Sequence, residues 1–169
     1  MCDTRYQTPF LTVTTVSPEQ TATLAAHLGR LLVGGDVLLL NGAVGAGKSH
    51  FARALIQARL ADLGRVEDVP SPTFTLVQTY DLDAVELWHA DLYRLSDPHD
   101  CLELGLDHAF DTAICLIEWP DQLAGHAPTD ALTVNFRQAD DPDTRHLEFS
   151  ATADRWRGLL AQLPKGGFA

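Results

Sequence analysis

A glycine-rich segment between an apolar run and an amphipathic stretch constrains the fold of this chain more than any other feature. It fits the pattern G-x-x-x-x-G-K-[ST] and reads Gly42-Ala43-Val44-Gly45-Ala46-Gly47-Lys48-Ser49. The run Val37–Leu40 before it is short and continuously apolar, which is typical of a strand buried on both faces. The stretch from about Lys48 to Leu63 after it carries apolar residues at helical spacing. Strand, glycine-rich turn and helix in this order predict a loop that binds phosphate.

Each residue type in this segment has a physical role in holding a nucleotide. Glycines allow backbone conformations that turn several N–H groups toward an anion, and the N-terminus of the following helix adds its positive dipole end. Lys48 supplies a positive charge for the β- and γ-phosphates, and the Ser49 hydroxyl is placed to bind Mg²⁺. We therefore expect the segment to bind ATP with Mg²⁺. ATP is favoured over GTP because the chain contains no N-K-x-D sequence, the guanine-specific element.

The rest of the sequence indicates strands alternating with helices, which predicts an α/β fold. The turn Asp81–Ala84 predicts that two strands form an antiparallel hairpin. We expect a single P-loop NTPase domain over residues 1–169, with a mainly parallel sheet flanked by helices. The expected strands are Leu11–Val16, Val37–Leu40, Phe74–Tyr80, Val85–Asp91, Ala113–Ile117, Leu132–Arg137 and His146–Ser150. The expected helices start near Ser17, Lys48, Ser96 and Thr152, and end near Gly34, Leu63, Leu104 and Leu163.

Composition excludes several classes of protein. The chain has 12 basic and 23 acidic residues and a net charge of −11, so nonspecific binding to a nucleic-acid backbone is not expected. No apolar run approaches the roughly 20 residues that span a bilayer, and the N-terminus lacks a signal-peptide pattern. Cys2, Cys101 and Cys115 show no CxxC spacing. This argues against a disulfide framework or structural zinc and favours a reducing, cytoplasmic location.

Two acidic residues at the ends of expected strands are candidates for binding the metal and orienting water. Glu118 follows the apolar strand Ala113–Ile117, and Asp91 ends the run Val85–Asp91. Ligands of open α/β sheets bind beyond the carboxyl ends of the strands, where both carboxylates are expected to lie. A solvated strand end is the alternative for each residue. It has more weight for Asp91 than for Glu118, because the run that carries Asp91 is only half apolar and contains charge.

For three further residues, Thr73, His89 and Trp119, the sequence is compatible with either a structural or a functional role. Thr73 precedes an expected strand; it either offers oxygen to Mg²⁺ or the γ-phosphate, as a switch between nucleotide states, or forms a plain turn. Trp119, next to Glu118, either lines the site or belongs to the core. His89 is typical of a packed or solvated neighbour, and we assign it no chemical role.

Five stretches together resemble the TsaE family, formerly called YjeE, over roughly residues 18–137. They are GAVGAGKS (42–49), SPTFTL (71–76), HADLYRL (89–95), ELGL (103–106) and ICLIEWP (114–120). The family comprises bacterial ATPases required for threonylcarbamoyladenosine modification of tRNA. The resemblance implies a P-loop fold, weak Mg²⁺-dependent ATPase activity, and TsaB-like and TsaD-like partners. In that complex TsaD modifies adenosine 37 of certain tRNAs and ATP hydrolysis resets the complex, so contact with tRNA is expected to be indirect.

The resemblance also implies roles for residues already singled out. One of the family's two carboxylates is expected to contact the metal directly and the other through water, and which does so stays open. The phosphate-binding lysine falls on Lys48, the metal-binding hydroxyl on Ser49, the switch-like threonine on Thr73, the Walker B aspartate on Asp91, and the Glu-Trp pair on Glu118 and Trp119.

The chain departs from the family pattern at two positions in or beside the loop. Ala43 stands where the family usually has Asp, which removes an acidic contact. His50 stands where the family usually has Thr, so a hydroxyl that touches the α-phosphate is lost, and a ring nitrogen of His50 is the substitute donor. Binding is expected to survive because the backbone and Lys48 remain, with a different affinity.

Two other functions remain open at this stage. A small-molecule kinase usually carries an arginine-bearing lid; here Arg137 and Arg145 flank an acidic loop, residues 138–144, without a lid pattern. A nucleotide-gated binding module without catalysis is the third interpretation. Phosphorylation of a metabolite, or partner binding without turnover, would distinguish these from an ATPase.

Overall fold

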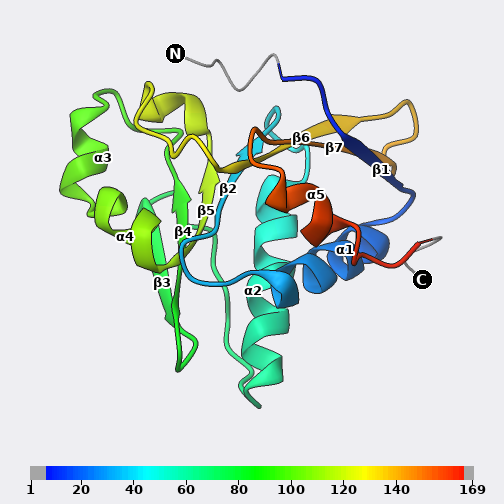
Figure 1. Ribbon diagram of the computed structural model, residues 1–169, viewed down its shortest axis with the longest axis horizontal. Helices are drawn as coiled ribbons and strands as arrows, with labels where there is room; N and C mark the ends of the chain where they lie inside the picture. Colours follow the sequence, from blue (N-terminus) through cyan, green and yellow to red (C-terminus); the bar gives the residue numbers. More distant parts are fainter. Residues whose placement is uncertain (1–6, 166–169) are drawn as a thin grey trace.

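The computed structural model describes residues 7–165 and shows a seven-stranded sheet with helices on both faces (Figure 1). The strands lie in the order β1-β7-β6-β2-β5-β4-β3. Along the chain the elements are β1 (Leu11–Thr15), α1 (Pro18–Leu31), β2 (Val37–Asn41), α2 (Lys48–Asp62), β3 (Val77–Asp81), β4 (Glu86–Asp91), α3 (His99–Glu103), α4 (Leu106–Thr112), β5 (Ile114–Glu118), the 3₁₀ helix η2 (Pro120–Leu123), β6 (Leu132–Gln138), β7 (Arg145–Ser150) and α5 (Arg155–Leu160).

The sheet is mixed, so the expectation of a mainly parallel sheet holds only for its centre. Strands β6, β2, β5 and β4 pair in parallel, whereas β1, β7 and β6 pair antiparallel on one side. The short connection 139–144 explains the β6–β7 pairing, because strands joined without a crossover must run antiparallel. On the other side, the expected β3–β4 hairpin is confirmed.

Two hydrophobic layers hold the helices against the sheet, and β2 contributes to both. Leu38 and Leu40 pack with α1, α2 and α5, whereas Val37 and Leu39 pack with α3, α4 and η2. Successive side chains of a strand point to opposite faces, so a continuously apolar strand is buried on both sides. The end of β2 is therefore fixed between two packed layers, and the glycine-rich segment starts from a rigid position.

Helix α1 begins as expected and anchors α2. The Ser17 hydroxyl accepts a hydrogen bond from the Gln20 backbone N–H over 3.2 Å, and Gln20 Oε1 accepts from the Val16 N–H over 3.0 Å. Such reciprocal capping stabilises a helix start. Further along, a Cβ on Gly29 would lie 2.7 Å from Leu55 Cγ, so the absence of a side chain there lets α1 pack closely on α2.

Several element boundaries differ from those expected from the sequence. Strand β3 starts at Val77 instead of Phe74, because the Leu76 N–H bonds to the Pro72 carbonyl oxygen at 2.7 Å and Leu76 has a left-handed φ of 67°. The helix expected to end near Leu104 is followed by an unpredicted helix, α4. The C-terminal helix covers only Arg155–Leu160, and the turns after it lead to Pro164, which disfavours helix in the residue before it.

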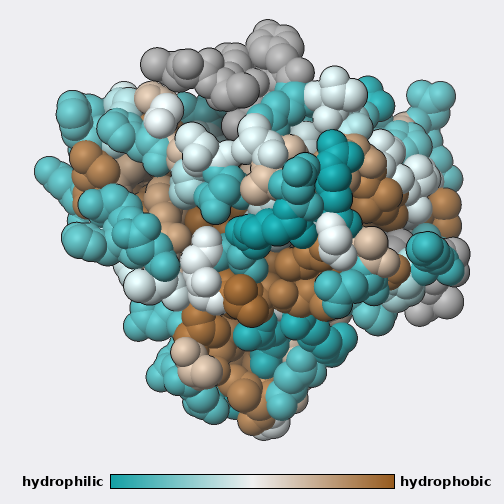
Figure 2. Space-filling view, in the orientation of Figure 1, coloured by the Kyte–Doolittle hydropathy of each residue, from teal (hydrophilic) through white to brown (hydrophobic). Residues whose placement is uncertain are grey.

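The described cysteines form no disulfide, and one face of the molecule is largely hydrophilic. Cys101 and Cys115 are buried and unpaired by disulfides, and Cys2 lies outside the described residues. Hydrophilic residues cover most of the face in Figure 2, with hydrophobic patches toward its middle and lower part. Within residues 7–165, no helix is both long and apolar enough to cross a membrane.

Candidate nucleotide-binding site

The glycine-rich segment joins β2 to α2 in a conformation that only glycine adopts easily. Gly42, Gly45 and Gly47 have φ angles of 154°, 78° and 108°, in the region that residues with a Cβ rarely occupy. A Cβ on Gly42 would also lie 3.0 Å from the Phe136 carbonyl oxygen. Helix α2 starts at Lys48 directly after the turn, so its first N–H groups face the same space as the loop.

A cavity of about 600 Å³ opens beside this loop. Every candidate site residue from the sequence lines it except Gly42, which lines a smaller adjoining cavity with Ala43 and Trp119. The larger cavity is bounded by Ala43–His50 and by residues that come from other parts of the chain: Pro18, Thr21, Thr73, Asp91, Tyr93, Glu118, Trp119, Pro142, Asp143 and Arg145.

Lys48 is buried at the base of the loop, with only 6% of its surface exposed. Its ammonium group donates hydrogen bonds to the carbonyl oxygens of Gly42 and of Ala43, the latter over 3.1 Å. The same nitrogen lies 4.0 Å from the centroid of the Trp119 ring, within range of a cation–π contact. Burial lowers the pKa of Lys48 from its ordinary value, while the carboxylates of Glu118 and Asp91 act in the opposite direction.

Ser49 and Glu118 are hydrogen-bonded across the base of the cavity. The Ser49 hydroxyl donates to Glu118 Oε1 over 2.7 Å, which connects the first turn of α2 to the end of β5. Glu118 is 1% exposed and is the register partner of Asp91 on β4. The two carboxylates therefore end adjacent parallel strands, at the sheet edge where the sequence placed them.

The segment before β3 reaches the site through Thr73. Its hydroxyl donates to Asp91 Oδ2 over 3.2 Å and pairs with the Ser71 hydroxyl at 2.7 Å. Asp91 Oδ1 accepts from the Tyr93 N–H over 3.1 Å. Thr73 thus contacts one candidate metal ligand directly, and its role as a switch stays a prediction.

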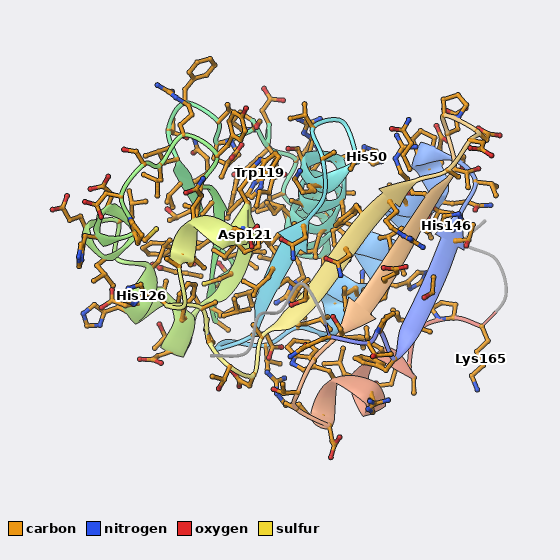
Figure 3. The ribbon with its side chains drawn as sticks, turned by 90° about the horizontal axis from the view of Figure 1, so that it is seen from above. His50, Trp119, Asp121, His126, His146 and Lys165 are labelled. Atoms are coloured by element: carbon orange, nitrogen blue, oxygen red, sulfur yellow. The ribbon has the colours of Figure 1, made fainter. Side chains whose placement is uncertain are left out.

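A sharp turn after β5 brings Trp119 into the site. Its φ and ψ of 57° and 53° are left-handed, which costs a non-glycine residue energy. The ring packs against Tyr93 in a tilted arrangement, with 4.9 Å between the ring centroids and 48° between the planes, and it covers the Lys48 ammonium group. In Figure 3, where α2 is seen nearly end-on, Trp119 and His50 lie on either side of the helix. Both interpretations left open by the sequence hold in part: Trp119 lines the cavity and also packs against the hydrophobic layer formed with α3, α4 and η2.

His50 is engaged by helix α1. Its Nε2 lies 2.8 Å from the Pro18 carbonyl oxygen, and a neutral ring that donates through Nε2 has only an acceptor at Nδ1. Donation to an α-phosphate by His50 therefore stays a prediction, and it requires the ring to give up this contact or to be charged.

Two residues that sequence reasoning did not assign also belong to the site. Arg145, at the start of β7, donates through Nε to the Ala46 carbonyl oxygen at 3.0 Å and through Nη2 to that of Gly45 at 3.4 Å. His89 lies with Nε2 3.4 Å from Glu118 Oε2. Strand alternation puts His89 on the same face as Asp91, a signal that could have found it. No local pattern connects Arg145 to the loop.

The oxygen donors at the base of the cavity suit a hard cation. Within the described part of the chain, no group of three or more His, Cys, Asp and Glu side chains forms a closed metal site. Mg²⁺ typically uses only one or two carboxylates and takes its remaining ligands from water and substrate phosphates. Ser49, Asp91 and Glu118 are such a partial set, so these residues fit Mg²⁺ bound together with a nucleotide.

Comparison with known proteins identifies the family of the chain. The sequence model of the family described as "Threonylcarbamoyl adenosine biosynthesis protein TsaE" matches residues 15–147. The tRNA threonylcarbamoyladenosine biosynthesis protein TsaE of Bacillus subtilis is 34% identical over 152 residues, which is 89% of this chain and 92% of that protein. The protein of the same name from Haemophilus influenzae is 35% identical over 126 residues, 74% of this chain and 76% of that protein.

A solved structure has the same fold. The crystal structure of Bacillus subtilis YdiB superposes with a TM-score of 0.73 at 32% sequence identity. The match covers 90% of this chain and 93% of that one.

Proposed function

The chain belongs to the TsaE family, and on that premise we propose that it binds and hydrolyses ATP during threonylcarbamoyladenosine biosynthesis on tRNA. The observation that carries this proposal is the convergence of Lys48, Ser49 and Glu118 beneath a glycine-rich loop. A positive charge and a hydroxyl at the start of a helix, with a carboxylate from a neighbouring strand end, are the groups that a bound Mg²⁺–nucleotide requires.

The proposed binding step uses the backbone and Lys48. The N–H groups of the loop and of the first turn of α2 bind the phosphates, and Lys48 exchanges its contacts with the Gly42 and Ala43 carbonyl oxygens for phosphate oxygens. Arg145 stabilises the loop by donating hydrogen bonds to the Ala46 and Gly45 carbonyl oxygens. Trp119 covers the Lys48 side chain and limits access of water.

The proposed hydrolytic step uses the residues at the strand ends. Ser49, Asp91 and Glu118 would hold Mg²⁺, which when bound neutralises charge developing on the phosphates. One of the two carboxylates would contact the ion directly, and the other would act through a water molecule. Thr73 lies in the segment before β3. Its hydroxyl hydrogen bond to Asp91 would couple the position of this segment to a change at Asp91.

We further propose that hydrolysis resets a complex with TsaB-like and TsaD-like proteins in the cytoplasm. The net charge of −11 favours contact with a protein over contact with RNA, so tRNA would be bound by the partners. The similar Bacillus subtilis and Haemophilus influenzae proteins are both named as tRNA threonylcarbamoyladenosine biosynthesis proteins.

The deciding experiment is titration with ATP by calorimetry, combined with an assay of phosphate release. Lys48→Ala should lose about 3 kcal/mol of binding free energy, roughly 100-fold in Kd. Lys165→Ala is the matched control, because Lys165 is exposed and far from Trp119 and His50 in Figure 3. Unchanged ATP affinity in a folded Lys48→Ala variant would overturn the site.

The same assay separates the alternative functions. Release of phosphate to water supports the ATPase, whereas a phosphorylated metabolite with little free phosphate identifies a kinase. ATP-dependent capture of TsaB-like and TsaD-like proteins without any turnover identifies a binding module.

A further inference from the structure

His89 is a buried imidazole that the proposed reaction leaves without a role. It lies on β4, is 1% exposed, and places Nε2 3.4 Å from Glu118 Oε2. Among the described residues, neither ring nitrogen of His89 nor Glu118 Oε2 has a hydrogen-bond partner. Buried polar atoms without partners are costly, so three of them within one pair of side chains require an explanation.

The two oxygens of Glu118 face different neighbours. Oε1 accepts from the Ser49 hydroxyl at 2.7 Å, on the side of α2. Oε2 faces His89, on the side of β4. The 3.4 Å separation is a few tenths of an ångström longer than a fully formed N–H···O hydrogen bond, so a small adjustment of either side chain completes the contact.

We infer that His89 is a positioning residue for Glu118. Its Nε2–H supports Oε2 and thereby keeps Oε1 directed at Ser49 and the base of the cavity. Without this support, the carboxylate is held on one side only and can turn away from the site. The inference rests on the proposed ATPase function, and it concerns the orientation of Glu118 rather than the binding of the nucleotide.

Supporting hydrogen bonds to groups that hold metals typically contribute roughly 10–100-fold to metal affinity or activity. We therefore expect His89→Leu to lower kcat by a factor in that range with little change in KM. Calorimetry supplies a second measurement: ATP affinity without Mg²⁺ should stay at the wild-type value, while the gain in affinity on adding Mg²⁺ should shrink.

Two amide variants separate hydrogen bonding from packing. The Gln side-chain nitrogen reaches about as far as Nε2 of His, and the shorter Asn nitrogen corresponds to Nδ1. His89→Gln should therefore recover most of the loss, and His89→Asn should not. This comparison remains decisive if His89→Leu fails to fold. Thr133→Val is the matched control, because the Thr133 hydroxyl is also buried without a partner and its removal should leave kcat unchanged.

The outcomes are distinguishable. If the wild-type protein releases no phosphate, the proposed function fails. If it does, and His89→Leu matches it in both kcat and the Mg²⁺ effect, only the role of His89 fails. Equal losses in His89→Gln and His89→Asn would also overturn that role, because they would show that the ring shape matters and its N–H does not.

Discussion

The Ser49 hydroxyl donates to Glu118 Oε1 over 2.7 Å, so the first turn of α2 and the end of β5 share one hydrogen bond at the base of the cavity. This bond connects the residue expected to hold the metal with the carboxylate expected to hold it or to orient water. A substitution at Glu118 can therefore remove the negative charge while keeping an oxygen that accepts this hydrogen bond.

Glu118→Gln should bind ATP and hydrolyse it slowly. The amide oxygen can still accept from Ser49, but the negative charge is lost. We expect kcat to fall by roughly 100-fold, the usual effect of removing one electrostatic group from an active site. Phosphate release measures the fall, and calorimetry without Mg²⁺ should show little change in ATP affinity. Glu103→Gln, an exposed change on α3, serves as the control; wild-type turnover in Glu118→Gln would remove Glu118 from the mechanism.

ATP binding should become pH-dependent on the alkaline side of neutrality. Burial lowers the pKa of Lys48 below its ordinary value of 10.5, so the free protein loses this proton as the pH rises through the lowered value. Phosphate binds the charged form, and ATP affinity should therefore fall over the same range while binding takes up a proton. Calorimetry in two alkaline buffers of different ionisation enthalpy measures that uptake.

The carboxylate beside Lys48 supplies a test of the sign. Glu118 raises the pKa of Lys48, so Glu118→Gln should move the onset of proton uptake to lower pH. Lys165→Ala should leave uptake as in the wild type. Absence of proton uptake at every alkaline pH would contradict a Lys48 that binds the phosphates.

Arg145 should matter for ATP affinity because it holds the tip of the loop. Arg145→Ala removes the hydrogen bonds to the Ala46 and Gly45 carbonyl oxygens. Because the Arg145 side chain is partly exposed, we expect the variant to lose only about 1 kcal/mol of ATP binding free energy, which is roughly fivefold in Kd. Arg137→Ala is the matched control from the same hairpin, where Arg137 pairs with Glu148 at 2.8 Å. Equal affinities in the two variants would exclude a role for Arg145 in shaping the loop.

Thr73 should act through its hydroxyl. Thr73→Val keeps the shape of the side chain and removes the hydrogen bond to Asp91 Oδ2, whereas Thr73→Ser keeps the bond. We expect turnover to fall roughly tenfold in the valine variant, because that is about the contribution of one hydrogen bond to a charged group. Turnover should stay near the wild-type value in the serine variant. Single-turnover phosphate release measures both. A serine variant as slow as the valine variant would show that packing, and not the hydroxyl, matters.

The sequence predicted the features that depend on neighbouring residues. Strand β2, the loop and the start of α2 follow one another directly in the chain. The pattern G-x-x-x-x-G-K-[ST] between a buried strand and a helix is specific enough to predict the loop. The places of Glu118 and Asp91 at adjacent strand ends follow from parallel pairing, because carboxyl ends of parallel strands meet at one edge. Their catalytic roles stay predictions.

Contacts between distant segments could not be predicted in the same way. Arg145 reaches Ala46 only because β7 folds back beside β6 and β6 lies beside β2. His89 reaches Glu118 only because β4 and β5 are neighbours. The β3–β4 hairpin was predicted, but the antiparallel pairing of β1, β7 and β6 was not. The six-residue connection 139–144 is too short for a crossover, so the antiparallel β6–β7 pairing could have been predicted from the sequence.

The folded-back position of Lys48 has a thermodynamic consequence. Because its ammonium group already binds two carbonyl oxygens of its own loop, the protein carries an internal competitor for the place of the phosphate. Any anion that enters must displace this competitor, and the measured affinity is the difference between the two interactions. Weakly charged anions should therefore fail to displace it, and we expect the loop to discriminate among ligands by their charge.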